Sequence, residues 1–285
     1  MGWVERARLW NETYGERLHL EPELIRFSFE KTATQDPVVV TTPSFELLCK
    51  LEKNLLRLHL PIPLKKLGAN EFAPLRDKAR ELGALKIIFG GGDRHLFPGV
   101  PLSGDLRQWL QWIPPKGEAV VDLEGSLALL VKESEKIQLR GILRPPKNSE
   151  EQKTLLDFVA REFPGRWTRE ISNDFLAGLQ KYYFGYFIEG ELTGYVRLYG
   201  WNREYKGPGN NFIRGQEKLG GLGPIGVAAA LRGAGFGAQI LKASWNVLLA
   251  HGCSRVRVDW TTEIGFYEKK GLTIVQEYQP AQIQI

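Results

Sequence analysis

The stretch GGLGPIGVAAALRGAGFG (residues 220–237) decides the fold of the second half of the chain. Its first part predicts a short strand from Leu222 to Val227, and the glycines that follow predict a tight turn into a helix. Glycines at positions 233, 235 and 237 carry no Cβ atoms, so main-chain N–H groups can close around a phosphate. The start of a helix also attracts negative charge. We therefore expect an anion-binding turn here.

Composition is that of an ordinary folded protein. The 285 residues have room for two domains, each with its own core, and 43% of them are hydrophobic. The formal net charge of +5 suits an anionic ligand, but the basic residues are spread along the chain, without the exposed aromatics of a nucleic-acid groove. We expect no nucleic-acid partner. No apolar run reaches about 18 residues and the first residues lack a signal-peptide core, so we expect no membrane segment and a cytoplasmic location.

Cysteine and histidine usage indicates neither disulfides nor metal. Cys49 and Cys253 lie far apart, each among apolar residues, which predicts buried thiols in a reducing compartment. The histidines, at positions 19, 59, 95 and 251, share no metal-ligand spacing with each other or with cysteine. We expect no metal site.

The order of predicted elements indicates an α/β protein with two domains. From residue 137 the pattern reads strand, two helices, three strands, helix, strand, short helix and strand, and the first half gives a similar, shorter series. We expect domains at residues 1–133 and 137–285, joined by a charged crossing near residues 131–136. Within them we predict one long strand over residues 45–60, a helix capped by Ser149, and a helix over residues 172–180.

Two motifs of the second half resemble the GNAT superfamily of acyl-CoA-dependent N-acetyltransferases. RGAGFG (residues 232–237) is similar to that family's pyrophosphate loop, and GFYEKKGL (residues 265–272) is similar to its Phe-Tyr-Glu-Lys segment. The resemblance covers about residues 137–279, and the first half, which offers PIPLKKLGAN (residues 61–70) at the equivalent place, looks like a degenerate copy without the loop. It implies two GNAT-like domains, each a mixed, mostly antiparallel sheet with a splayed parallel strand pair and flanking helices.

The resemblance also implies the site. Acetyl-CoA would lie where the strand before the loop parts from its parallel neighbour, and Pro224 suits that interruption because proline cannot donate to a sheet. Tyr267 would protonate the leaving sulfur, and Glu217 or Asp259 would accept the proton of the amine, directly or through water. Thr261 stands where the family often has an asparagine that contacts the cofactor. The residues implied to hold the cofactor are Ile225, Val227, Arg232, Gly233, Ala234, Gly235, Phe236, Gly237 and, as a substitute contact, Thr261.

Two other functions compete with this interpretation. Gly233, Gly235 and Ala238 also satisfy a dinucleotide-binding fingerprint, with Asp259 about twenty residues on. Against it, residues 228–232 separate the strand from the first glycine, and too few residues follow for a six-stranded doubly wound sheet. The departure at Thr261 and the unassigned base motivate the second alternative, a catalytically silent CoA-binding sensor or scaffold protein.

The acceptor is expected to be a primary amine of a small molecule or a peptide. Residues 201–211 (WNREYKGPGNN) form a long loop that is either a surface excursion or a wall of the acceptor site, and the segment GGDRHLFPG (residues 91–99) is either a structural turn or a contact with acceptor. The candidate acceptor contacts are Trp201, Tyr205, Arg94 and His95. The sequence leaves monomer and homodimer open.

Overall fold

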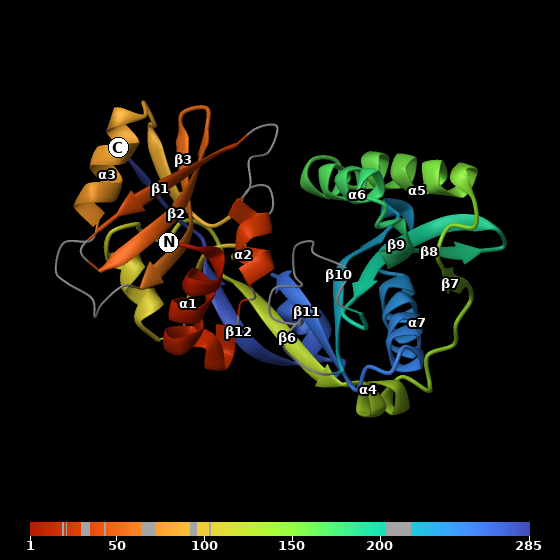
Figure 1. Cartoon of the computed structure of the whole chain (residues 1–285). Coiled ribbons are helices and arrows are strands. Elements are labelled where there is room, and N and C mark those ends of the chain that lie inside the picture. Colours follow the sequence, from red (N-terminus) through yellow and green to blue (C-terminus); the bar gives the residue numbers. More distant parts are fainter. Residues whose placement is uncertain are drawn as a thin grey trace. The chain divides into compact units, whose positions relative to one another are not determined.

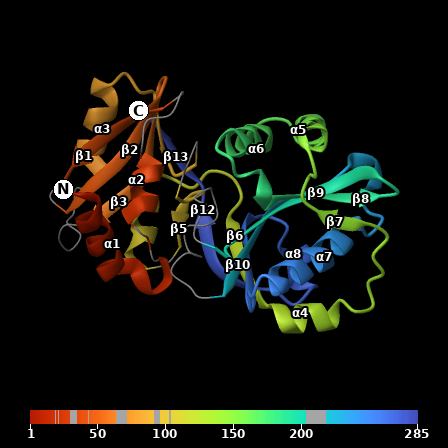
Figure 2. The same cartoon turned by 45° about the vertical axis from the view of Figure 1, so that its right-hand side comes forward.

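The structure is a computed structural model that describes all 285 residues except 19, 21, 30–34, 43, 64–71, 92–95, 103 and 203–217. The chain divides into two compact units (Figures 1 and 2). The first unit contains Met1–Asp122, Trp260–Thr262 and Ile274–Ile285. The second contains Leu123–Asp259 and Glu263–Thr273.

The first unit has a five-stranded sheet with the strand order β1-β2-β3-β4-β13. Strands β3 and β4 are parallel, and the other neighbours are antiparallel. Helix α1 packs on β3, α2 on β2, and α3 on β1 and β4. Elements of this unit, in chain order, are α1 (Trp3–Leu18), α2 (Pro22–Phe29), β1 (Asp36–Thr41), β2 (Phe45–Glu52), β3 (Leu55–Pro63), α3 (Phe72–Glu81), β4 (Lys86–Phe89), β5 (Val100–Pro101), the 3-10 helix η1 (Gly104–Gln111), β12 (Thr273–Gln279) and β13 (Ala281–Gln284).

Residues 45–60 form a hairpin and not the single long strand that the sequence predicted. Strands β2 and β3 pair antiparallel from Glu52↔Leu55 to Phe45↔Pro63. The turn between them contains Lys53, whose φ of 53° lies in the left-handed region, and Asn54. The apolar residues continue on both sides of this turn, so alternation alone did not mark where the strand ends.

The C-terminal strand completes the first sheet. Strand β13 pairs antiparallel with β4, from Ala281↔Phe89 to Gln284↔Lys86. The sequence-based division assigned residues 274–285 to the second domain, because hydrophobic alternation identifies a strand but not its partner. The functional labels of the two domains, one degenerate and one cofactor-binding, stay proposals.

The second unit is a mixed sheet with helices on both faces. Its strands run in the order β6-β11-β10-β9-β8-β7, with β10 and β11 parallel. Helices α5 and α6 lie on one face, and α4 and α7 lie on the other (Figures 1 and 2). The elements are β6 (Val120–Ser126), α4 (Leu127–Glu133), β7 (Ile142–Arg144), α5 (Ser149–Glu162), α6 (Arg166–Leu176), the 3-10 helix η2 (Gln180–Tyr182), β8 (Tyr183–Ile188), β9 (Glu191–Tyr199), β10 (Leu219–Val227), the 3-10 helix η4 (Ala229–Leu231), α7 (Phe236–Ala250), β11 (Arg255–Thr261) and α8 (Ile264–Glu268). Strands β6, β11 and β12 have residues in both units.

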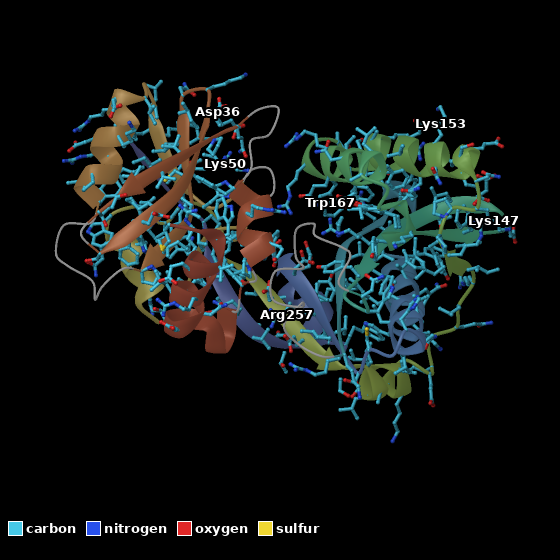
Figure 3. The ribbon with its side chains drawn as sticks, in the orientation of Figure 1. Asp36, Lys50, Lys147, Lys153, Trp167 and Arg257 are labelled. Atoms are coloured by element: carbon cyan, nitrogen blue, oxygen red, sulfur yellow. The ribbon has the colours of Figure 1, made fainter. Side chains whose placement is uncertain are left out.

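Aromatic side chains fill the space between the sheet and helices α5 and α6. Tyr183, Tyr195 and Tyr199 of strands β8 and β9 are buried there with Phe158 of α5. Trp167 of α6, labelled in Figure 3, packs its ring 5.0 Å from the Phe163 ring and 6.2 Å from the Tyr195 ring. Burial of rings of this size makes a large contribution to stability. This layer therefore fixes the helix pair over β8 and β9.

Two helix starts differ from the sequence-based prediction. Asn148, and not Ser149, caps α5, because its side chain accepts a hydrogen bond from the Glu151 N–H. Helix α6 begins at Arg166 after Gly165, whose φ is 100°, six residues before the predicted start at Ser172. Serine and asparagine are common caps, but Ser172 bonds instead to the Thr168 carbonyl inside the helix. The preference of serine and asparagine for cap positions therefore placed the predicted start of α6 too late in the sequence.

The overall fold class is confirmed. The first unit has the parallel pair β3–β4 and the second has the parallel pair β10–β11, each next to antiparallel pairs and flanked by helices. The two cysteines are free and buried, as predicted, and burial raises the pKa of Cys253 to about 11. Within the part of the chain that the structure describes, no helix is long and apolar enough to cross a membrane.

Candidate active site

The site begins where two parallel strands part. Strands β10 and β11 are paired from Leu219↔Arg255 to Leu222↔Val258. Beyond that pair β10 continues to Val227 on the β9 side alone, where Ile225, Gly226 and Val227 face Val196, Tyr195 and Gly194. The other edge of Ile225–Val227 is thus not paired with β11. Main-chain groups on such an edge are available to a ligand that carries amide groups.

A bulge in β10 lies at the same point. Two residues, Gly223 and Pro224, occupy the space opposite the single residue Arg197 of β9. Gly223 has φ +148°, a conformation that side chains rarely adopt, and Pro224 has no N–H to give to a neighbouring strand. A bulge bends its strand and re-aims it. The sequence therefore ends the β10–β11 pairing with these two residues.

The glycine-rich turn follows at the end of β10. Residues 232–235 are exposed, and Gly233 and Gly235 have φ values of 80° and 83°. No atom lies within 4 Å of the position that a Cβ would take at either glycine. Helix α7 begins directly after Gly235, its N-cap, which has no side chain to bond the first N–H groups. These features leave a helix start with its N–H donors open to an anion.

Two side chains hold the base of this turn. The Glu162 carboxylate accepts a hydrogen bond of 2.8 Å from the Ala229 N–H, and this bond is the main cause that lowers the pKa of Glu162. Arg232 donates from Nε to the Val227 carbonyl at 3.1 Å, and its guanidinium lies 5.4 Å from the centre of the Phe163 ring. Arg232 therefore flanks the turn and is tied to the last residue of β10.

Helix α8 brings the second sequence motif to the first. A Cβ on Gly237 would lie 3.4 Å from Cζ of Phe266, an ordinary contact, so α8 packs against the first turn of α7. The neighbouring Tyr267 is only 4% exposed. Burial, together with the charges of Asp259 and Glu263, raises the pKa of its phenol. Among the described residues none forms a hydrogen bond with this hydroxyl. Its proton is thus retained and not committed elsewhere.

Asp259 lies at the point where the strands part. It follows Val258, the last residue of β11 that pairs with β10, and it is half-buried. Tyr199 donates a hydrogen bond of 3.0 Å from its hydroxyl to Oδ1 of Asp259. Burial raises the pKa of this carboxyl, partly offset by the charge of Arg197 and by the Tyr199 hydrogen bond. A carboxylate with a raised pKa is suited to proton transfer near neutral pH.

Charged side chains continue along the neighbouring strands. Arg257 of β11, labelled in Figure 3, is buried and donates from Nε to Oε1 of Glu124 on β6 at 2.6 Å. Arg255 forms an ion pair with the same carboxylate. The charge of the Glu124 carboxylate is thus balanced by two arginines. We assign these three residues a structural role in the sheet.

The structure describes most of the predicted site residues. Thr261 is the last residue of β11 and is half-buried. Trp201 stacks on His251, with ring centroids 4.4 Å apart, and its ring centroid lies 5.4 Å from that of Tyr182. Glu217, Tyr205, Arg94 and His95 lie outside the described residues. In the described part of the chain no group of three or more His, Cys, Asp and Glu side chains is arranged to hold a metal ion.

Sequence reasoning missed Tyr199 and Arg197. Both lie on β9 and, with Tyr195, alternate along one face of the strand beneath α5 and α6. The signal was an arginine inside an otherwise apolar strand, YVRLY (residues 195–199). A buried charge requires partners, so this residue pointed to a polar cluster in the interior.

Comparisons with known proteins agree with this geometry. Residues 153–272 match the model of the acetyltransferase (GNAT) family. A search of curated proteins found no match to the chain. Among solved structures, one similar chain is a fungal multi-domain GH3 β-N-acetylglucosaminidase with a GCN5-related glucosamine N-acetyltransferase region, with a TM-score of 0.79 and 19% identity. The match covers 99% of this chain but only 37% of the fungal chain.

Two further structures are matched over nearly their whole length. A tandem GNAT protein from the clavulanic acid biosynthesis pathway has a TM-score of 0.68 and 15% identity, covering 99% of this chain and 93% of its own. A GCN5-related N-acetyltransferase from Sphaerobacter thermophilus has a TM-score of 0.61 and 13% identity, with 99% and 92% covered. At these identities the likeness establishes the fold.

Proposed function

We propose that this chain transfers an acetyl group from acetyl-CoA to a primary amine, because residues 153–272 match the model of the acetyltransferase (GNAT) family and the chain shares the fold of a tandem GNAT protein. The single observation that carries this proposal is the combination of an open strand edge at Ile225–Val227 with the exposed turn that follows it. The pantetheine arm of CoA, which contains amides, would match the open strand edge, and the diphosphate at the end of that arm would match the turn.

The residues present suit acetyl-CoA. N–H groups of residues 233–237 would hold the diphosphate, since nothing within 4 Å fills the space beside Gly233 and Gly235. Main-chain groups of Ile225 and Val227 would bond the amides of the pantetheine arm, with Arg232 beside the turn. When bound, acetyl-CoA supplies an acetyl thioester, and the protein's task is positioning and proton transfer.

In the proposed reaction the amine nitrogen attacks the thioester carbonyl carbon, the C–N bond forms and the C–S bond breaks. Asp259 accepts the proton that the nitrogen loses, and Tyr267 gives its proton to the sulfur. An N–H near Val227 would stabilise the charge that develops on the carbonyl oxygen. The raised pKa values of both groups support these roles, because Asp259 can take up a proton and Tyr267 keeps one near neutral pH.

A direct test is release of CoA thiol against a panel of amines. The panel begins with glucosamine, because the similar fungal chain has a glucosamine N-acetyltransferase region, and includes an amino acid, a polyamine, an aminoglycoside and a peptide. We expect at least one amine to accelerate thiol release. If the chain binds acetyl-CoA and no amine accelerates release, a CoA-binding sensor replaces an enzyme as the function.

Replacing Asp259 with Asn should lower kcat about 100-fold with the best amine, because the base is lost while the shape of the side chain is kept. The matched control is Asp157→Asn, since Asp157 is an exposed aspartate on α5 that pairs with Lys153, which is labelled in Figure 3. Steady-state kinetics at saturating acetyl-CoA gives both values. Equal turnover in the two variants would remove Asp259 from the mechanism and return Glu217 to consideration.

A further inference from the structure

Two glycines of β10 make room for two side chains near the point where the strands part. A Cβ on Gly221 would overlap the ring of Tyr199, and a Cβ on Gly223 would overlap Oδ1 of Asp259. Gly220, by contrast, faces Leu248 and Cys253 on the other side of the sheet. The glycines at 221 and 223 therefore serve the Tyr199–Asp259 pair and do not contribute to the phosphate-binding turn.

The pair is rigidly built. The Tyr199 ring is fully buried in the aromatic layer under α5 and α6, and its hydroxyl points to Oδ1 of Asp259 at 3.0 Å. Tyr183 forms a comparable buried bond to Asp174 at 2.8 Å, so a buried tyrosine–aspartate pair is not special to the point where the strands part. What distinguishes Asp259 is its place, one residue beyond the last β10–β11 pair.

We propose that Tyr199, whose ring fills the space beside Gly221, is a positioning residue: it fixes one oxygen of Asp259 in the space left by Gly223, so that the carboxylate meets the ammonium form of the acceptor amine and receives its proton. This inference rests on the proposed function, and it adds an acceptor site that is selective for cationic amines. The hydrogen bond keeps Asp259 ionised more readily than burial alone would allow.

Several charged and titratable groups act on Asp259 and set the pH dependence. Arg197 of β9 and Arg166 of α6 favour its ionised form, as does the Tyr199 hydrogen bond. Tyr267 of α8 and Glu263, which precedes α8, interact electrostatically with this region. Removing the Tyr199 hydroxyl takes away one contribution that lowers the pKa of Asp259, so that pKa should rise. As the pH is lowered, the variant should therefore lose the activity that requires ionised Asp259 at a higher pH than the unsubstituted chain does.

The test uses the full chain with ¹³C-labelled aspartate carboxyls, with Asp259→Asn to assign the signal. We expect Tyr199→Phe to raise the titration midpoint of Asp259 by about one pH unit, the usual scale for a hydrogen bond to a carboxylate. Tyr186→Phe is the control, because it removes a buried tyrosine hydroxyl that bonds Gln239 and the Gly141 N–H instead of Asp259, and it should leave the midpoint unchanged. An unmoved midpoint in Tyr199→Phe, or an equal shift in the control, would overturn the proposal.

Kinetics separates this inference from the proposed function. With an amine that the chain acetylates, Tyr199→Phe should lower kcat/KM for the amine about tenfold near neutral pH. The acidic limb of the pH profile should move to higher pH by about one unit, and the affinity for acetyl-CoA should not change. Thermal unfolding verifies that the variant is folded. If it is not, Gly221→Ala, which displaces the Tyr199 ring and has no positive φ to strain, replaces it. Absence of acetyl-CoA binding by the unmodified chain defeats the proposed function, whereas normal turnover with an unshifted limb defeats only the role of Tyr199.

Discussion

Replacing Tyr267 with Phe is expected to lower kcat about 100-fold and to leave acetyl-CoA affinity nearly unchanged. General acid catalysis contributes on this scale, and phenylalanine keeps the buried ring while it removes the proton that the sulfur would take. The fold should tolerate the change, because none of the described residues forms a hydrogen bond with this hydroxyl. Pre-steady-state and steady-state thiol release, together with calorimetry of acetyl-CoA, measure both quantities.

The control for this prediction is Tyr186→Phe. The Tyr186 hydroxyl bonds Gln239 of α7 and the Gly141 N–H, both at 2.9 Å, so its loss removes more hydrogen bonds than the loss of Tyr267. We expect a loss of stability and normal turnover per folded molecule. If Tyr267→Phe turns over as fast as the control, the acid is another group or water, and the assignment of Tyr267 is wrong.

Replacing Gly235 with Asp is expected to weaken acetyl-CoA binding about 100-fold at low ionic strength. The new carboxylate would stand beside the diphosphate, where like charges repel, and added salt should reduce the effect. The new side chain would not clash with the protein, because no atom lies within 4 Å of the position of its Cβ. Calorimetric titration at two salt concentrations measures the loss.

Gly235→Asn is the matched variant for this second prediction. Asparagine has nearly the shape of aspartate and is also among the side chains that tolerate the φ of 83° found at Gly235. It carries no charge, so we expect most of the affinity to remain. Equal losses in the two variants would mean that backbone conformation, and not charge, governs binding. Unchanged affinity in both would place the ligand away from this turn.

The local parts of the site were predictable from the sequence. The glycine-rich turn was visible because glycines before a helical pattern give a specific backbone requirement, and Pro224 marked the place where strand pairing stops. The roles assigned to these residues remain proposals, but their setting agrees with the prediction. Residues 232–235 are exposed, and α8 packs on the first turn of α7.

The rest of the site depended on contacts across the sheet. Tyr199 and Asp259 are sixty positions apart, and only the strand order β9-β10-β11 brings them together over the glycines of β10. The pairing of the last strand, β13, with β4 could not be predicted for the same reason. Alternation of apolar residues gives the face of a strand but carries no information about its neighbour. The boundary errors at residues 45–60 and 172–180 have a different origin, since turn and cap preferences are weak beside tertiary packing.

Calorimetric titration of the full chain with acetyl-CoA, alongside S-acetylpantetheine, which lacks the diphosphate, tests the central claim most directly. We predict saturable binding of acetyl-CoA, no competition by NAD, and a large loss of affinity for the truncated compound, because the N–H groups after Gly233 would have no anion to bind. Absence of acetyl-CoA binding, or equal affinity for the two compounds, would contradict the assignment of residues 232–237 as the diphosphate site.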